Sequence, residues 1–262
     1  MRVHIVKRED CPLLKKILLI VGAVALALVL GGLVLLAMGV NPLEYYFKMF
    51  TMGMVGNKIA YKAAENYLKI LVPLILTALG LSLAFKMRFW NIGGEGQFIV
   101  GAIAAAAVAF TAGPVLPTPV VLLLMCLAAM LAAGLLGLFV AALKVKFGTS
   151  ETLLTLMLNY IALYFLTFLG ETKADWNFFL SAESARPTFA SFTSMVSFPR
   201  MMLGKFGLNI CVLITLALGV LVYVYLKRTK QGYEIAVVGD SMGTARYAGM
   251  KVSTIVLRTV FL

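Results

Sequence analysis

Six long apolar segments alternate with short polar ones along the chain. Each is rich in Leu, Ile, Val and Ala and approaches or exceeds the ~20 residues with which an α-helix spans ~30 Å of hydrocarbon. The segments lack the two-residue alternation of membrane β-strands, so the pattern predicts transmembrane helices. The six predicted spans cover residues 17–38, 68–85, 97–113, 120–143, 152–169 and 208–226.

A further apolar stretch, IVLRTVFL, begins near Thr254 and runs to the end of the sequence at Leu262. It is too short to cross a membrane, so we expect the chain to be truncated at its C-terminus. The predicted fold is an all-α, polytopic helical membrane protein with six full spans and the start of a seventh. We expect residues 1–262 to form a single, incomplete transmembrane domain.

The composition excludes several classes of function. Hydrophobic residues make up 62% of the chain and charged residues 13%, against about 45–50% and about 25% in soluble domains. Such a chain has too little polar surface for a soluble enzyme or a nucleic-acid binder. The single histidine, His4, lies in the N-terminal tail. The predicted spans therefore hold no histidine-based proton relay, Ser-His dyad or His-ligated metal site.

Basic residues fall mainly on one predicted face of the membrane. They gather in the tail 1–16, at Lys86 and Arg88, at Lys144 and Lys146, and in the segment 227–254. If the spans alternate in direction, these segments share one face, and the positive-inside rule predicts that this face and the N-terminus are cytoplasmic. The net charge of +12 then indicates topology and contact with membrane lipids, and we expect no nucleic-acid partner.

Small residues recur at every fourth position in two predicted spans, which favours close helix packing in lipid. The alternative is that a common residue, alanine, produces this spacing by chance. The two stripes consist of Gly101, Ala105, Ala109 and Gly113, and of Ala129, Ala133, Gly137 and Ala141.

A first polar group of residues, Asn91-Ile92-Gly93-Gly94-Glu95-Gly96-Gln97, lies between the second and third predicted spans. Three glycines in four residues disfavour a continuous helix, and a broken helix exposes backbone groups that can bind a polar solute. The other interpretation is an ordinary cytoplasmic turn at the start of the third span, with Glu95 favourable at the helix N-terminus. The spacing leaves both open.

A second polar group consists of Glu151, Thr155 and Asn159, spaced i, i+4 and i+8. This spacing places a carboxylate, a hydroxyl and an amide on one stripe of the fifth predicted span. Such a stripe suits a solute with several hydroxyls. Hydrogen bonds between helices are the alternative.

Three connecting segments are also informative. In the predicted extracytoplasmic loop 170–207, aromatic residues such as Trp176 indicate either an interfacial belt or a docking site for an extracytoplasmic partner. Residues 44–69 predict an interfacial amphipathic helix. In 227–254, Asp240 or Ser241 is a candidate N-cap for a short helix over 242–248, with Gly249 behind it. That helix suits a force-transmitting contact, although a solvated loop has a similar composition.

Three strings of residues then resemble one family. FWNIGGEGQFIVGA (89–102), GTSETLLTLMLNYIA (148–162) and GYEIAVVGDSMGTARYAGMKV (232–252) resemble, in this order, the permease subunits of ABC importers for nucleosides and simple sugars, which are ribose-type and branched-chain amino acid permease-like proteins. The resemblance extends over the chain after about residue 40, and family members continue for several helices past the position of Leu262. The NIGxEGQ form favours a nucleoside over a sugar as substrate.

The resemblance implies a multi-pass protein of the bacterial plasma (inner) membrane with several partners. They are cytoplasmic ATP-binding subunits, a second permease subunit, homologous or identical, and an extracytoplasmic solute-binding lipoprotein or protein. The sequence contains no GxxxxGK[ST] motif, so we expect ATP and Mg²⁺ on the partner ATPase, with no cofactor and no catalytic or metal site on this chain.

The resemblance also implies that the segment 232–252 contains a coupling helix seated on the ATPase, while the substrate path is a hypothesis based on the polar residues of the spans. Ser241-Met242-Gly243-Thr244 replaces the usual Asn-Pro-containing stretch, which affects only where the coupling helix starts. The predicted substrate path consists of Asn91, Glu95, Gln97, Glu151, Thr155 and Asn159. The predicted ATPase-coupling residues are Gly232, Asp240, Ala245, Arg246, Tyr247, Ala248 and Gly249.

Two other functions compete with this interpretation. An ion-coupled secondary transporter of a small polar solute also uses glycine-broken helices and intramembrane carboxylates. An intramembrane enzyme is poorly supported, because only carboxylate chemistry remains and nothing in the sequence indicates that Glu95 and Glu151 lie close together.

Overall fold

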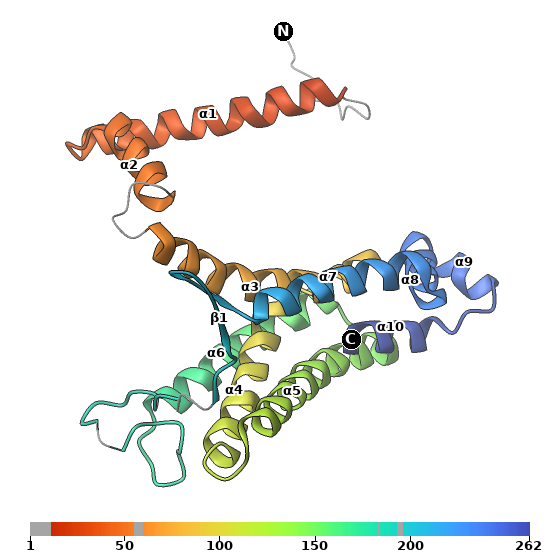
Figure 1. Cartoon of the computed structure of the whole chain (residues 1–262). Helices are drawn as coiled ribbons and strands as arrows, with labels where there is room; N and C mark the ends of the chain where they lie inside the picture. Colours follow the sequence, from red (N-terminus) through yellow and green to blue (C-terminus); the bar gives the residue numbers. More distant parts are fainter. Residues whose placement is uncertain (1–11, 55–59, 183, 193–195) are drawn as a thin grey trace. The chain divides into compact units, whose positions relative to one another are not determined.

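The computed structural model describes residues 12–54, 60–182, 184–192 and 196–262 (Figure 1). Among the described residues, six helices are long and apolar enough to cross a membrane, which confirms the predicted all-α membrane fold and its spans. The six are α1 (Leu13–Ala37), α3 (Ala60–Lys86), α4 (Gly94–Ala112), α5 (Thr118–Phe147), α6 (Glu151–Glu171) and α7 (Cys211–Arg228).

The chain divides into two compact units, Met1–Asn66 and Tyr67–Leu262. In the first unit α2 (Pro42–Met54) packs on α1, where the Tyr46 hydroxyl donates a 2.8 Å hydrogen bond to the Leu28 carbonyl. Of the helix predicted over 44–69, the residues up to Met54 belong to α2 and those from Ala60 belong to α3. Most of the predicted tail 1–16 and residues 55–59 lie outside the described residues.

In the second unit α4 packs along α5 and α6. The predicted small-residue stripes meet in this contact: a Cβ added to Gly101 would lie 3.3 Å from the Ala129 carbonyl oxygen and 3.5 Å from the Ala133 Cβ. Two helix backbones approach this closely only where side chains are small. Chance spacing of alanines does not account for this part of the stripes.

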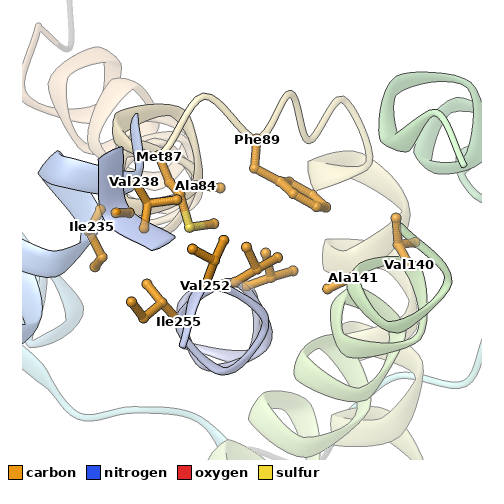
Figure 2. Close-up of a cluster of buried hydrophobic side chains, with 12 residues drawn as sticks. Ala84, Met87, Phe89, Val140, Ala141, Ile235, Val238, Val252 and Ile255 are labelled. Atoms are coloured by element: carbon orange, nitrogen blue, oxygen red, sulfur yellow. The ribbon is translucent and has the colours of Figure 1, made fainter. Parts of the chain in front are cut away.

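Three further helices follow α7 and pack on the ends of the spans. They are α8 (Lys230–Asp240), α9 (Met242–Tyr247) and α10 (Val252–Phe261). In Figure 2, Val252 and Ile255 of α10 lie between α8 and the end of α3 on one side and α5 on the other. The larger hydrophobic core consists of Ala84, Met87, Phe89, Val140, Ala141, Ile235, Val238, Ala245, Val252, Ile255, Val256 and Val260.

Segment 227–254 is therefore built of packed helices and is not a solvated loop. The short helix predicted for 242–248 is confirmed as α9: the Ser241 hydroxyl accepts a 3.2 Å hydrogen bond from the Thr244 amide, and Gly249 ends the turn with φ of +77°. Glycine adopts this left-handed conformation without steric cost. Helix α8 was not predicted, and α10 occupies the segment predicted to begin a seventh span.

The segment between α6 and α7 contains the only named strands of the described residues. They are β1 (Arg200–Leu203) and β2 (Phe206–Asn209), an antiparallel hairpin in which Arg200 pairs with Asn209 and Leu203 with Phe206. Gly204 begins its two-residue turn with φ of +63°, a conformation typical of such hairpins. This short hairpin is an addition to the predicted all-α fold.

Candidate solute path and coupling surface

The candidate solute path starts in the loop between α3 and α4. The glycine-rich string does not break a span, because Gly94 is the first residue of α4 and Gly93 precedes it. Asn91 is 4% exposed and folds the loop through both ends of its amide. Its Oδ1 accepts a 2.9 Å hydrogen bond from the Gly93 amide, and its Nδ2 donates a 3.0 Å bond to Gln97 Oε1.

Two side chains of α6 hold this loop from the other side. The Thr155 hydroxyl oxygen accepts a 3.2 Å hydrogen bond from the Ile92 amide. Asn159 Oδ1 accepts a 2.7 Å bond from the Gly96 amide, and its Nδ2 donates a 2.9 Å bond to the Ile92 carbonyl. The amide of Gly96 belongs to the first turn of α4, whose N–H groups have no partner inside the helix. Asn159 therefore supplies a cap from another helix.

The glycines make this contact possible. A Cβ on Gly93 would lie 2.9 Å from the Thr155 Cβ, and one on Gly96 would lie 2.7 Å from Asn159 Oδ1 and 3.0 Å from its Cα. Any larger residue would push the loop away from α6. The glycines of this string are thus points of close approach between the loop and α6, a role that their spacing in the sequence did not indicate.

Gln97 connects this loop to two other helices. Gly137 of α5 leaves room for the Gln97 amide, because a Cβ added there would collide with Gln97 Nε2. The same added atom would lie 3.1 Å from the Val260 carbonyl oxygen of α10. Gln97 therefore lies at a junction of α4, α5 and α10.

The two carboxylates of the predicted path differ in their surroundings. Glu151 forms an ion pair with Lys144, and their side chains are 13% and 20% exposed. Lys144 Nζ also lies 4.9 Å from the centre of the Phe89 ring. Lys144 and Phe89 were not predicted as site residues, since Lys144 was interpreted only as a topology signal. Glu95 is exposed and has no ion-pair partner among the described residues.

The predicted coupling residues fall into a buried and an exposed set. Ala245 is completely buried in the larger core, and Gly232 is buried at the start of α8. The side chain of Tyr247 is 96% exposed. The other exposed members are Asp240, Arg246, Ala248 and Gly249. Helix α9 thus packs on the core through one face, and the rest of its surface is exposed.

Close backbone contacts fix α8, which carries α9, to the spans. A Cβ on Gly239 would collide with the Lys86 carbonyl oxygen at the end of α3. A Cβ on Gly232 would collide with the carbonyl oxygens of Tyr225 and Leu226 in α7. Gly239 was not predicted as a functional residue, because its partner is the backbone of a distant helix end.

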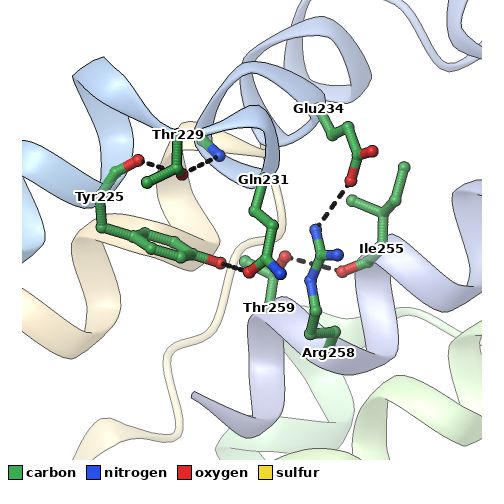
Figure 3. Close-up of polar contacts among 8 residues, drawn as sticks. Tyr225, Thr229, Gln231, Glu234, Ile255, Arg258 and Thr259 are labelled. Atoms are coloured by element: carbon green, nitrogen blue, oxygen red, sulfur yellow. Dashed lines mark hydrogen bonds and ion pairs between the residues drawn. The ribbon is translucent and has the colours of Figure 1, made fainter.

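Polar contacts also join α7, α8 and α10 (Figure 3). The Tyr225 hydroxyl donates a 2.8 Å hydrogen bond to Gln231 Oε1. Arg258 of α10 pairs with Glu234 of α8 across 3.0 Å, with side chains 30% and 18% exposed. This ion pair joins α8 and α10 through two residues that lie 24 positions apart in the sequence.

Residues 63–262 match the family described as branched-chain amino acid transport system / permease component. The chain belongs to this family. It is accordingly a multi-pass membrane protein of the permease type. Among the residues described, no cluster of three or more histidine, cysteine, aspartate or glutamate side chains is arranged to hold a metal ion.

Individual permeases resemble the chain over most of its length. It is 28% identical over 249 residues to the nucleoside ABC transporter permease protein NupB of Lactococcus lactis, covering 94% of this chain and 67% of NupB. It is 30% identical over 237 residues to the glucose ABC transporter permease protein TsgB13 of Haloferax volcanii, covering 88% of this chain and 60% of TsgB13. The chain is 29% identical over 237 residues to the guanosine ABC transporter permease protein NupP of Bacillus subtilis, covering 88% of this chain and 63% of NupP.

The chain spans 60–67% of the length of these three relatives. No solved structure matches it significantly. The three relatives are named for different solutes: a nucleoside, glucose and guanosine. In this structure, the family-like strings 89–102 and 148–162 meet where Asn159 and Thr155 bind the loop.

Proposed function

We propose that the chain is the membrane-spanning permease subunit of an ATP-driven ABC importer and forms a path for a nucleoside or a simple sugar. Its family membership over residues 63–262 carries this proposal. Relatives named for a nucleoside, guanosine and glucose support this range of solutes. The NIGxEGQ string favours a nucleoside over a sugar as the substrate.

ATP hydrolysis is assigned to a separate subunit, since this sequence contains no phosphate-binding GxxxxGK[ST] motif. In this proposal ATP and Mg²⁺ bind the partner ATPase, and the permease performs no chemistry. A second permease subunit and an extracytoplasmic solute-binding protein complete the importer. The basic ends of α3, α5 and α7, which include Lys86, Lys144 and Lys227, support a cytoplasmic location for α8–α10 and the N-terminus.

The polar residues of the path have two roles in this proposal. Asn91, Thr155 and Asn159 position the loop, because their polar groups already bind backbone groups or, for Asn91 Nδ2, the Gln97 side chain. Glu95 is the exposed carboxylate beside that loop, and we assign it direct contact with hydroxyl groups of the solute. Gln97 and the Glu151–Lys144 pair connect the same region to α5.

Helix α9 is proposed as the contact with the ATPase. It is held against the spans, because Ala245 is buried in the larger core and Gly239 of the adjoining α8 lies against the end of α3. Tyr247, at 96% exposure, is an aromatic residue that a partner can bury, and such residues dominate the binding energy of many interfaces. ATP-driven motion of the partner would then shift the packed helices between discrete arrangements.

Replacing Tyr247 with alanine tests this docking role. The complex of the permease with its ATP-binding subunits should lose about tenfold or more in affinity, and stimulation of ATP hydrolysis by solute should fall with it. Folding should be unaffected, because the side chain contacts little of its own chain. Affinity measured in detergent and ATPase assays on the assembled complex report the two effects.

The control is Tyr233→Ala, which removes a 62% exposed tyrosine from α8 and should leave both quantities near wild type. Normal affinity and normal stimulation in the Tyr247→Ala complex would refute α9 as the docking helix.

A further inference from the structure

The end of α6 opposite the α3–α4 loop is covered by the segment that follows it, residues 172–182 and 184–192. Asn177 is 6% exposed, and its Nδ2 donates 2.7 Å hydrogen bonds to the carbonyl oxygens of Leu169 and Thr172. The last carbonyls of a helix have no partner inside it, and at the end of a span they need one before they meet lipid. The chain therefore folds back to cap α6.

The same fold-back places two aromatic rings beside the last turn of α6. The Trp176 ring stacks on Phe168, with centroids 6.0 Å apart and planes at 23°. The Phe189 ring lies over Gly170, where an added Cβ would be 3.0 Å from Phe189 Cζ. Both rings therefore lie alongside the helix and not beyond its end.

The outer faces of these rings are not covered by the described chain. Trp176 is 54% exposed, Phe189 52% and Phe168 50%. They continue the exposed apolar surface of the span itself, to which Tyr164 and Phe165 belong, at 71% and 47%. A surface that is lipid-facing along the span and aromatic at its end is typical of the membrane interface.

A second set of rings holds the segment on α4. Phe179 is 8% exposed and packs edge-on against Phe110 of α4, with centroids 6.1 Å apart. Phe192 stacks on the same Phe110 ring at 4.9 Å. The segment is therefore anchored to two spans, which fixes the height of Trp176 relative to both.

We propose that this segment is embedded in the bilayer interface, with Trp176 and Phe189 at the depth of the lipid headgroups. The occupant of the exposed aromatic surface is thus lipid. An indole ring suits this position because its apolar body faces the acyl chains while its N–H meets water and headgroups.

The length of α6 fits this placement. Its 21 residues correspond to about 31 Å at 1.5 Å per residue, close to the ~30 Å thickness of the hydrocarbon. At its other end lies Trp90, which is 59% exposed beside Phe85 in the loop that Thr155 and Asn159 hold. The two tryptophans of the sequence therefore mark the two interfaces of the same span.

Because the 262-residue chain contains two tryptophans, the depth of each is measurable in this chain. The Trp90→Phe variant leaves Trp176 alone, and the Trp176→Phe variant leaves Trp90 alone. Each is reconstituted into phosphatidylcholine and phosphatidylglycerol vesicles with nitroxide lipids labelled near the headgroup or near the end of the acyl chain. We expect each tryptophan to be quenched more strongly by the shallow label than by the deep one.

A matched pair of variants tests the fold-back itself. In the Trp90→Phe background, Phe168→Leu removes the stacking partner of Trp176 and should raise its quenching by aqueous iodide. Phe165→Leu changes a similarly exposed ring of α6 that has no described stacking contact with Trp176, and should leave iodide quenching unchanged.

Three outcomes would overturn the proposal. Strong iodide quenching of Trp176 with weak lipid quenching places the segment in solution. No quenching by either agent places the ring under protein, a partner or a second copy. Stronger quenching by the deep label than by the shallow one places the ring inside the hydrocarbon.

Discussion

At the scale of residues, the chemistry of the candidate path depends on which polar groups remain available to a solute. Thr155 and Asn159 already form hydrogen bonds with backbone groups of Ile92 and Gly96. Glu151 is paired with Lys144. Leaving such groups unpaired in a buried site is costly, so their replacement would disturb the loop before it disturbed solute binding. In the proposed path, Glu95 is therefore the carboxylate whose replacement should change solute contact most selectively.

The isosteric change Glu95→Gln should therefore raise the KM of uptake by about fivefold to tenfold, because a hydrogen bond to a charged group contributes about 1–1.5 kcal/mol more than one to a neutral group. Assembly of the importer should be normal, because Glu95 is exposed and unpaired within the described chain. Initial rates of radiolabelled solute uptake at several concentrations provide the measurement.

Glu171→Gln is the matched control, since it neutralises an exposed carboxylate at the other end of α6. Equal kinetics for wild type and both variants would remove Glu95 from the path.

The sequence identified the polar residues of this region but not their roles. The stripe of Glu151, Thr155 and Asn159 follows from helical spacing alone. The partners of Thr155 and Asn159 do not, because they are backbone groups 63 or 67 residues away. For the same reason the glycines were interpreted as a helix break or an ordinary turn, although Gly93 and Gly96 allow two segments to touch.

At the scale of elements, the ion pair between Glu234 and Arg258 fastens α10 to α8. The pair is partly buried, so its removal should cost more than that of a surface pair and less than that of a fully buried one. Replacing Glu234 with glutamine should weaken the contact by about 1–2 kcal/mol. Amide hydrogen exchange in α10 should become roughly fivefold to thirtyfold faster if exchange follows local opening.

A second ion pair of the chain serves as the comparison. Lys48 and Glu44 of α2 form an i, i+4 pair with side chains 55% and 59% exposed, and Glu44→Gln should leave exchange in α10 unchanged. If exchange in α10 is equally slow in the Glu234→Gln protein, the pair does not fasten these helices.

An element could be predicted where its own sequence carries a strong pattern. The spans were found because an uninterrupted run of about 20 apolar residues is rare outside membrane-spanning helices. Helix α9 was found from its N-cap Ser241 and from Gly249. Helix α8 was missed, because its burial depends on contacts between Gly239 and the end of α3 that leave no local pattern. The β1–β2 hairpin has strands of only four residues, too short for a clear alternation.

At the scale of the whole molecule, the second unit joins the proposed coupling helix to the proposed path through continuous packing. The larger core includes Ala245 of α9, Val252 of α10 and Phe89 of the α3–α4 loop, and Asn91 lies two residues beyond Phe89. Packed cores respond to force by changing between discrete arrangements rather than by stretching. Motion imposed on α9 is therefore expected to reach the α3–α4 loop and the first turn of α4, where Glu95 lies.

The central claim is that ATP drives solute through this permease. The most direct measurement is uptake of radiolabelled guanosine and of radiolabelled glucose by proteoliposomes that contain the permease assembled with its ATP-binding and solute-binding partners. We predict that uptake of at least one solute requires ATP and Mg²⁺ on the side that α9 faces and persists when ionophores collapse ion gradients. Uptake driven by an imposed Na⁺ or H⁺ gradient in the absence of ATP would contradict the claim and identify an ion-coupled carrier.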